Sequence, residues 1–295
     1  MTRYAVRHET TYTYRAPVDM GLHVLRVTPL DQGGQRRLGQ DLTIVPKPTR
    51  VNSFIDHFGN IVHHIAVETT HARFSATLDA VVEVERPAAA DPGPAWETVR
   101  DAIQGDGFPV PFMAAEFAYP SPLAPVEDAA TAYAAESFDL SRPIVDAARD
   151  LAGRIHRDFR YVPHSTTIAT KVAEVFATRC GVCQDFAHLM ISGLRGLGLP
   201  ARYVSGYLHT HPSDTKAQRL GADASHAWVS VWCGDDLGWV GIDPTNDLVV
   251  ANEHVVIAHG RDFSDATPLH GVILGGGAHT LSVAVGVATI DGAES

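Results

Sequence analysis

Cysteine is scarce in this chain of 295 residues, which has only Cys180, Cys183 and Cys233. A small, odd number of cysteines in a chain of this length does not make a disulfide framework. The three thiols must therefore be explained by packing, by metal binding or by chemistry.

Long apolar runs and basic clusters are lacking as well. No run approaches the ~20 apolar residues that span a bilayer, and residues 1–8 lack the apolar core of a secretory signal, so we expect a cytoplasmic protein. The net charge is −11 and no cluster of Lys and Arg stands out, which disfavours nucleic acid and membrane surfaces as partners. The oligomeric state is left open. With 45% hydrophobic and 19% charged residues, the composition is that of a globular protein rather than a disordered one.

The first part of the chain has the pattern of an antiparallel sheet. Segments rich in Thr, Tyr and Val are bounded by turn residues. They predict strands at 4–14, 41–45, 61–69 and 74–84. We place a β-rich N-terminal domain at residues 1–88, followed by a linker rich in Pro and Ala at 86–94.

Further along, the spacing of apolar residues becomes helical. It predicts one helix over 143–159 and a second from about Cys183 to Leu197. The second is apolar on more than one face, so we expect it to be buried. Strands are predicted at 201–208, 227–232, 238–242 and 280–290. The fold class is therefore α+β, with a core at 95–265 and a C-terminal β segment at 266–295 that is free to pack on the N-terminal domain.

Cys183 lies where the second helix is predicted to start. Unpaired amides and the positive end of the helix dipole favour a thiolate there. The same amides are candidate donors to the oxyanion of a tetrahedral intermediate. An isolated cysteine in this position is otherwise read as a small core residue.

His226 and Asp243 belong to two strands that look like a hairpin. Opposed residues in an antiparallel pair have a constant sum of indices and share a face. A loop at 234–235 gives a sum of 469 and places His226 opposite Asp243. Moving the loop by one residue gives 471 and leaves them diagonal neighbours on the same face. In either register the carboxylate can orient the imidazole, and that imidazole could form an ion pair with Cys183 and protonate a leaving amine.

Other readings of these residues are open. His226 alone could be a polar strand end, and Asp243 alone a turn starter. Cys180 and Cys183 form a CxxC that can signal redox chemistry or half of a zinc site. His188, His209 and His211 could then supply nitrogen ligands, although no second CxxC follows.

Several motifs, taken together and in this order, resemble the bacterial transglutaminase-like proteins, which are often labelled cysteine proteases. They are Gly181-Val182-Cys183-Gln184-Asp185-Phe186-Ala187-His188, Arg202-Tyr203-Val204-Ser205-Gly206-Tyr207, Ser225-His226-Ala227-Trp228-Val229, Gly238-Trp239-Val240-Gly241-Ile242-Asp243-Pro244-Thr245-Asn246, and Gly260-Arg261-Asp262-Phe263-Ser264-Asp265 with Pro268-Leu269-His270-Gly271. The N-terminal β segment is similar to the N-terminal region of that family, so the resemblance covers nearly the whole chain.

The resemblance implies a papain-like transglutaminase core in which Cys183, on a helix, packs against an antiparallel sheet bearing His226 and Asp243 as the other members of a catalytic triad. It also implies a thioester intermediate on a peptide or protein amide substrate. Eukaryotic relatives use an upstream Trp as an oxyanion donor. No Trp lies between Asp150 and Cys183, and Tyr161 is the candidate substitute. The calcium motifs of those relatives have no counterpart, so we expect no metal and no cofactor.

Three functions compete at this point. The first is cysteine-dependent acyl transfer, with hydrolysis expected rather than cross-linking. The second is a non-catalytic module that binds peptides or mediates assembly. The third is a metal or redox site at Cys180 and Cys183. The substrate is not readable from the sequence, although the loop from Thr210 to Ala224 is a candidate lip of its cleft.

Overall fold

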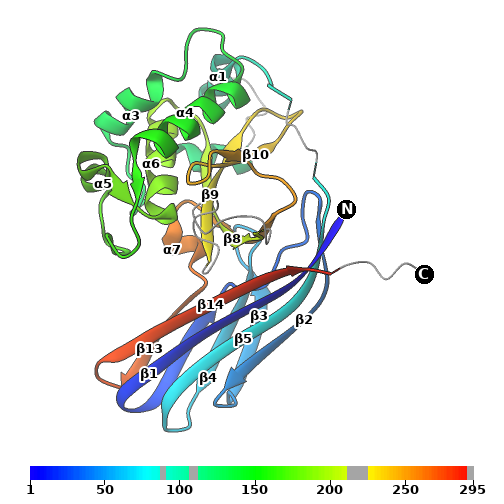
Figure 1. Ribbon diagram of the computed structural model, residues 1–295, viewed down its shortest axis with the longest axis vertical. Coiled ribbons are helices and arrows are strands. Elements are labelled where there is room, and N and C mark those ends of the chain that lie inside the picture. The colour runs from blue at the N-terminus through cyan, green and yellow to red at the C-terminus, as the bar shows by residue number, and fades with distance from the viewer. Residues whose placement is uncertain (87–90, 106–111, 211–224, 291–295) are drawn as a thin grey trace.

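The computed structural model describes residues 1–86, 91–105, 112–210 and 225–290. Two antiparallel sheets lie one above the other in the view of Figure 1, and most of the helices pack around the upper one. The predicted α+β class is therefore confirmed. Among the described residues, no helix combines the length and the apolar character needed to cross a bilayer.

The lower, seven-stranded sheet combines strands from both ends of the chain. Its order is β2-β5-β1-β4-β3, and β13 and β14 also pair with β1. The strands are β1 (Thr2–Leu25), β2 (Gln35–Val45), β3 (Arg50–Ile55), β4 (Ile61–Val67), β5 (His71–Val84), β13 (Leu269–Gly275) and β14 (His279–Thr289). The long β1 lies beside β5 and β14 in its first half and beside β4 and β13 in its second half.

One face of this sheet is buried, which explains why buried and exposed residues alternate along its strands. Tyr4, Val6 and His8 of β1 are buried, whereas Ala5 and Arg7 between them are exposed, as a strand with one covered face requires. In the second half, His23 stacks on Phe74 of β5 with ring centroids 3.9 Å apart. The inner faces of the two halves thus meet in one apolar core.

The upper, five-stranded sheet has the order β11-β10-β9-β8-β12 and is antiparallel throughout. Its strands are β8 (Ala201–Leu208), β9 (His226–Trp232), β10 (Trp239–Asp243), β11 (Leu248–Val249) and β12 (His254–Gly260). The helices are α1 (Trp96–Gln104), α2 (Phe112–Ala115), the 3-10 turn η1 (Glu116–Ala118), α3 (Asp128–Ala135), α4 (Ile144–Asp158), α5 (Val172–Thr178), α6 (Cys183–Gly196) and α7 (Phe263–Ala266).

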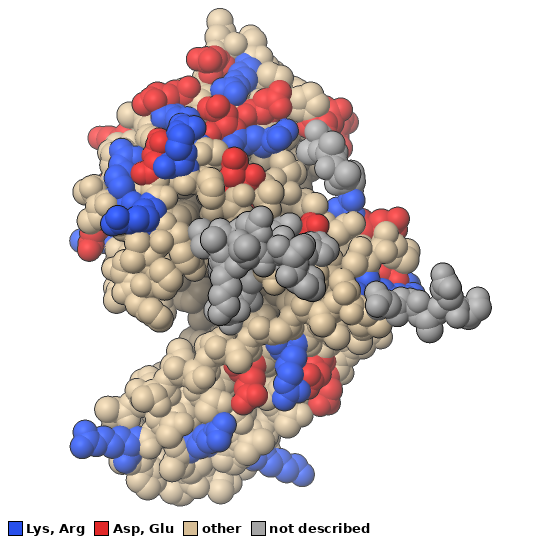
Figure 2. Space-filling view, viewed as in Figure 1, with Lys and Arg blue, Asp and Glu red and all other residues tan. Residues whose placement is uncertain are grey.

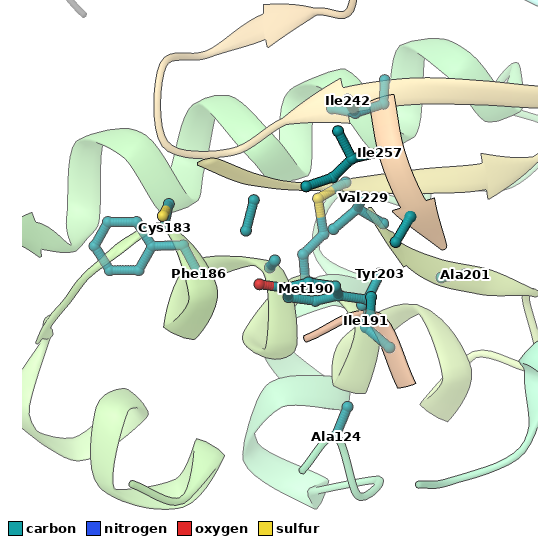
Figure 3. Close-up of a cluster of buried hydrophobic side chains, with 14 of the residues drawn as sticks. Ala124, Cys183, Phe186, Met190, Ile191, Ala201, Tyr203, Val229, Ile242 and Ile257 are labelled. Carbon is teal, nitrogen blue, oxygen red and sulfur yellow. The ribbon is translucent and has the colours of Figure 1, made fainter. Parts of the chain in front are cut away.

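Helix α6 is the centre of this upper part. Twelve of its fourteen residues are buried, as its apolar pattern predicts. Figure 3 shows Met190 and Ile191 of α6 packed near Tyr203 and Val229 of the sheet, with Cys183 and Phe186 at one end of the cluster. The helix that carries Cys183 is therefore held rigidly against the sheet.

Two side chains near the N-terminal strands bind the start of β12. The guanidinium of Arg86 donates to the carbonyl oxygens of Ala251 and His254 at 2.8 and 2.6 Å and to Gln35 Oε1 at 3.1 Å. Gln35 in turn accepts from the amide of Val256 at 2.8 Å. The lower sheet thus fixes the outer strand of the upper one.

On the face shown in Figure 2, charged side chains crowd the helical part and are sparse over the lower sheet.

The strands predicted at 4–14, 41–45, 61–69, 74–84, 201–208, 227–232, 238–242 and 280–290 all fall on observed strands. The strands β3, β12 and β13 were not predicted, nor were the two-residue strands at 160–161, 180–181 and 248–249. Strand β1 extends eleven residues beyond its predicted end at Tyr14. The candidate lip from Thr210 to Ala224 lies, apart from its first residue, outside the described residues.

Candidate active site

Cys183 is the first residue of α6 and is 8% exposed. Val182 before it is extended, with φ −121° and ψ −178°, which is the usual conformation of an N-cap residue. The Asp185 carboxylate turns back and accepts from the Val182 amide at 2.8 Å and from the Thr166 hydroxyl at 2.6 Å. This return contact is half of a capping box and fixes the first turn.

Gly181 is required immediately before that turn. A Cβ atom there would lie 2.8 Å from Cβ of Asp185, closer than side chains approach one another. Burial raises the pKa of Asp185, and the hydrogen bonds from Thr166 and Val182 oppose that rise. The start of α6 therefore depends on a glycine and a carboxylate that the sequence places on either side of the thiol.

His226 and Asp243 meet on the adjacent sheet, and both are fully buried. His226 Nε2 lies 2.8 Å from Asp243 Oδ2. The register of β9 and β10 pairs Trp239 with Trp232 and Ile242 with Val229, so the index sum is 471. The histidine and the carboxylate are accordingly diagonal neighbours on one face, as the second of the two predicted registers requires.

The Asp243 carboxylate receives more donors than a simple pair would supply. Oδ1 accepts from the amides of Thr245 and Asn246 at 2.9 and 3.2 Å. Oδ2 accepts from His226, from Asn246 Nδ2 at 2.8 Å and from His254 Nε2 at 3.3 Å. A buried carboxylate is stable as an anion only when it is satisfied in this way.

The charges of the pair shift both pKa values strongly. Burial alone would lower the pKa of His226, but the charge and hydrogen bond of Asp243, together with the nearby Cys183 thiol, raise it to about 10. Burial alone would raise the pKa of Asp243, but the charge and hydrogen bond of His226 and the hydrogen bond of His254 hold it well below its usual range. The geometry therefore favours an imidazolium beside a carboxylate.

Because Nε2 is bound to Asp243, Nδ1 is the ring nitrogen of His226 left to face the thiol. Nδ1 has no partner in ordinary hydrogen-bonding geometry within the described part of the chain. Cys183 is nevertheless close enough to raise the pKa of the ring. Such a loose contact is common in active sites without substrate.

Tyr161 lies next to the strand that leads into Cys183. In the short parallel pair of β6 (Arg160–Tyr161) and β7 (Cys180–Gly181), Tyr161 is the partner of Gly181. Its ring packs near Phe186, with centroids 6.4 Å apart. The predicted oxyanion residue is thus beside the start of α6.

His254, at the start of β12, is a site residue that sequence reasoning did not identify. It is one of sixteen histidines and stands before an apolar run, as a strand-end histidine without a chemical role also would. Its contact with Asp243 comes from the order of strands in the sheet, which spacing along the chain does not reveal. Asn246 was named only as the end of a motif, yet its side chain also donates to Asp243.

A disulfide between Cys180 and Cys183, as a redox CxxC would form, is not supported by the backbone. Cys180 and Gly181 form a strand and Val182 is extended. Three extended residues place the Cα atoms of Cys180 and Cys183 about 10 Å apart, beyond the ~7 Å limit for a disulfide. Cys180 Sγ instead accepts from the guanidinium of Arg160 at 3.3 Å.

The histidines considered as metal ligands have other contacts. His188 Nε2 accepts from the Phe263 amide at 3.1 Å, and the His209 ring packs on Tyr4 with centroids 5.0 Å apart. His211 lies outside the described residues. Within the described ranges, the three potential ligands that come together are His226, Asp243 and His254. Their contacts of 2.8 and 3.3 Å suit N–H···O hydrogen bonds, which a metal would have to displace.

Comparison with known protein families gives two matches along the chain. Residues 4–83 match the bacterial transglutaminase-like N-terminal region. Residues 131–244, which include Cys183, His226 and Asp243, match the transglutaminase-like superfamily.

Relatives and a solved structure extend the likeness to nearly the whole chain. An uncharacterized protein of Mycobacterium tuberculosis is 42% identical over 279 residues, which cover 92% of this chain and 87% of the relative. A Pseudomonas aeruginosa protein-glutamine gamma-glutamyltransferase is 40% identical over 73 residues, which cover 24% of this chain and 11% of that protein. The crystal structure of a candidate cysteine protease from Cytophaga hutchinsonii has a TM-score of 0.75 at 22% identity, covering all of this chain and 92% of that one, and so shares its fold. The chain therefore belongs to the transglutaminase-like superfamily, with a bacterial transglutaminase-like N-terminal region.

Proposed function

We propose that this protein is a thiol acyltransferase that acts on peptide or protein amides, with Cys183 as nucleophile, His226 as general acid and base, and Asp243 as the residue that orients His226. The observation that carries the proposal is the buried His226–Asp243 pair, coupled to a thiol at the start of a helix. Three ordinary structural residues would have no reason to converge at one point from α6, β9 and β10.

The reaction follows from this arrangement. The Cys183 proton passes to His226 Nδ1, and Sγ attacks the carbonyl carbon of the amide. The tetrahedral intermediate collapses as its C–N bond breaks and His226 Nδ1 returns the proton to the leaving amine. A thioester on Cys183 is left. Water, deprotonated by His226, then attacks the thioester, and a carboxylic acid leaves as the thiol is restored.

The oxyanion of each intermediate needs donors that are already in place. We propose the backbone amide of Cys183, at the N-terminus of α6, as the first donor. Tyr161 is the candidate second donor, since its strand lies beside Gly181. Asp185 supports the first donor by fixing the turn in which that amide lies.

We propose that water is the acceptor of the acyl group, so the reaction is hydrolysis rather than cross-linking. The protein-glutamine gamma-glutamyltransferase of Pseudomonas aeruginosa matches only part of this chain, and its name makes glutaminyl amides the first acyl donor to test. We also propose the division into domains at 1–88, 95–265 and 266–295, and the cytoplasmic location.

The test is incubation with a glutaminyl peptide, with and without a primary amine, followed by mass spectrometry of both peptide and protein. We expect ammonia release, a transient acyl adduct on Cys183 and little incorporation of amine. Cys183→Ser should lower turnover at least ~10³-fold, whereas Cys180→Ser should be nearly silent.

Different outcomes would redirect the assignment. Incorporation of amine far above hydrolysis would replace the hydrolase by a cross-linking enzyme. Peptide binding without any adduct, in a protein whose Cys183 reacts with iodoacetamide no faster than a free thiol, would favour a non-catalytic binding module. Loss of activity in Cys180→Ser but not in Cys183→Ser would mean that Cys180, and not Cys183, is the nucleophile.

A further inference from the structure

Asp243 is contacted by a second imidazole besides that of His226. His254 is 1% exposed, and its Nε2 lies 3.3 Å from Oδ2 of Asp243, the same oxygen that His226 Nε2 contacts at 2.8 Å. The other nitrogen of His254, Nδ1, has no hydrogen-bond partner among the residues that the structure describes. Its bond to the carboxylate is therefore the polar contact that orients this ring.

The position of the ring is fixed from two sides. Its edge-to-face contact with Trp228 has centroids 5.1 Å apart, and its own carbonyl accepts from Arg86 at 2.6 Å. The ring of His254 and its backbone are therefore both held, so Nε2 is presented to Oδ2 from a fixed position.

The two imidazoles differ in charge. Burial lowers the pKa of His254, and the hydrogen bond and charge of Asp243 only partly oppose it. The charges that face the ring are Asp243, His226 and Arg86, and the two cations favour its neutral form. His254 therefore donates to Oδ2 as a neutral imidazole. His226 binds the same oxygen, and it is the imidazole that gains and loses a proton in the proposed reaction.

We propose that His254 is a positioning residue of the acyl-transfer site, one that fixes the Asp243 carboxylate and shares its Oδ2 with His226. The inference rests on the proposed function, because it assigns His254 a role in the proton transfer of His226. Without His254, Oδ2 would keep its contacts with His226 and Asn246 Nδ2, but its charge would hold the His226 proton more tightly. The hydrogen bond from His254 limits this effect.

A matched pair of variants separates this role from simple packing. His254→Phe keeps a ring against Trp228 but removes the donor, and His254→Gln offers an amide N–H where Nε2 lies. On a glutaminyl peptide we expect His254→Phe to lower kcat about 10-fold with little change in KM, a loss typical of one hydrogen bond. His254→Gln should stay within about 3-fold of the unchanged protein.

A second readout does not depend on turnover. NMR titration of the His226 ring should show its pKa raised by about 0.5 to 1 unit in His254→Phe, because one fewer donor then shares Oδ2, and restored in His254→Gln. If the unchanged protein turns over no amide, the proposed function fails while this titration still tests the contact.

Several results would overturn the positioning role. An unchanged kcat and an unchanged His226 titration in His254→Phe would do so, as would equal losses in the phenylalanine and glutamine variants. Circular dichroism should show that each variant folds. If His254→Phe does not, His254→Met takes its place, and if neither apolar variant folds, His254 is a folding residue and the proposal is wrong.

Discussion

His226 and Asp243 lie diagonally across the β9–β10 hairpin, and by the same register Trp228 takes the position opposite Asp243. The indole contacts both histidines that share Asp243: its ring centroid lies 6.0 Å from that of His226 and 5.1 Å from that of His254. The two imidazole centroids are 6.4 Å apart. One aromatic side chain thus packs against both imidazoles that reach a single carboxylate.

Asp243→Asn tests the orienting carboxylate. The amide keeps the shape of the group, but it removes the negative charge that holds the His226 imidazolium. We expect kcat to fall about 10²- to 10⁴-fold, and NMR titration of His226 should show its pKa lowered from its raised value. An active Asp243→Asn with an unchanged His226 titration would contradict the assignment.

Asp185 tests the start of α6. Asp185→Ala removes the acceptor for Val182 N and for the Thr166 hydroxyl, so urea unfolding should show a loss of about 1–2 kcal/mol in the free energy of unfolding. Asp185→Asn keeps one acceptor oxygen and should lose less. Both variants should lower kcat, because the turn that holds the Cys183 amide loosens. An equal stability for all three proteins would mean that the cap has no effect on α6.

A substitution at Gly206 tests the close packing behind His226. Gly206 of β8 pairs with His226 of β9. A Cβ atom at Gly206 would lie 2.2 Å from the Trp228 ring and 2.3 Å from the Val255 carbonyl oxygen. Gly206→Ala should therefore destabilise the protein by about 1–3 kcal/mol or more. Gly286→Ala in β14 is the matched control, since a Cβ there meets nothing within 4 Å. Thermal unfolding of the two variants should differ clearly, and similar melting temperatures would count against the packing.

Stability should depend on pH through the His226–Asp243 pair. The pKa of His226 is raised on folding from 6.5 to about 10, so its contribution is complete below pH 6.5 and is lost as the pH rises towards 10. The pKa of Asp243 is lowered, so its contribution is complete above about pH 4 and is lost as the pH falls through the folded value.

Urea unfolding of the protein and of His226→Gln between pH 5 and pH 10 measures this dependence. The difference in free energy of unfolding between the two should be constant below pH 6.5 and shrink above it. A difference that stays flat up to pH 10 would show that the imidazolium is not stabilised by folding.

The residues of the site were predictable where local pattern decides the outcome. The position of Cys183 follows from the predicted start of its helix. His226 and Asp243 share a face in either hairpin register, so their proximity does not depend on which turn forms. The observed register follows from the β9–β10 turn, where Cys233 and Gly238 pair through the backbone, a detail that the turn residues alone do not fix.

The unpredicted parts depend on contacts distant in sequence. Every residue of β12 is buried, and a continuous apolar run of this kind lacks the alternation that distinguishes a strand from a helix. Strand β13 has apolar residues such as Val272 and Leu274 on its exposed side, which hides its alternation too. His254 joins the site only because β12 pairs with β8 at the edge of the sheet.

Strand β1 pairs with β14 over eleven positions, from Tyr4 with Thr289 to Tyr14 with His279. During synthesis, β1 leaves the ribosome before β14, so this edge is covered only after the residues between the two strands have been made. A nascent or truncated chain that ends after β5 would expose that edge of β1 along its length, and such an edge recruits other strands. Correct assembly therefore has to bring together two strands that are separated by almost the whole described chain.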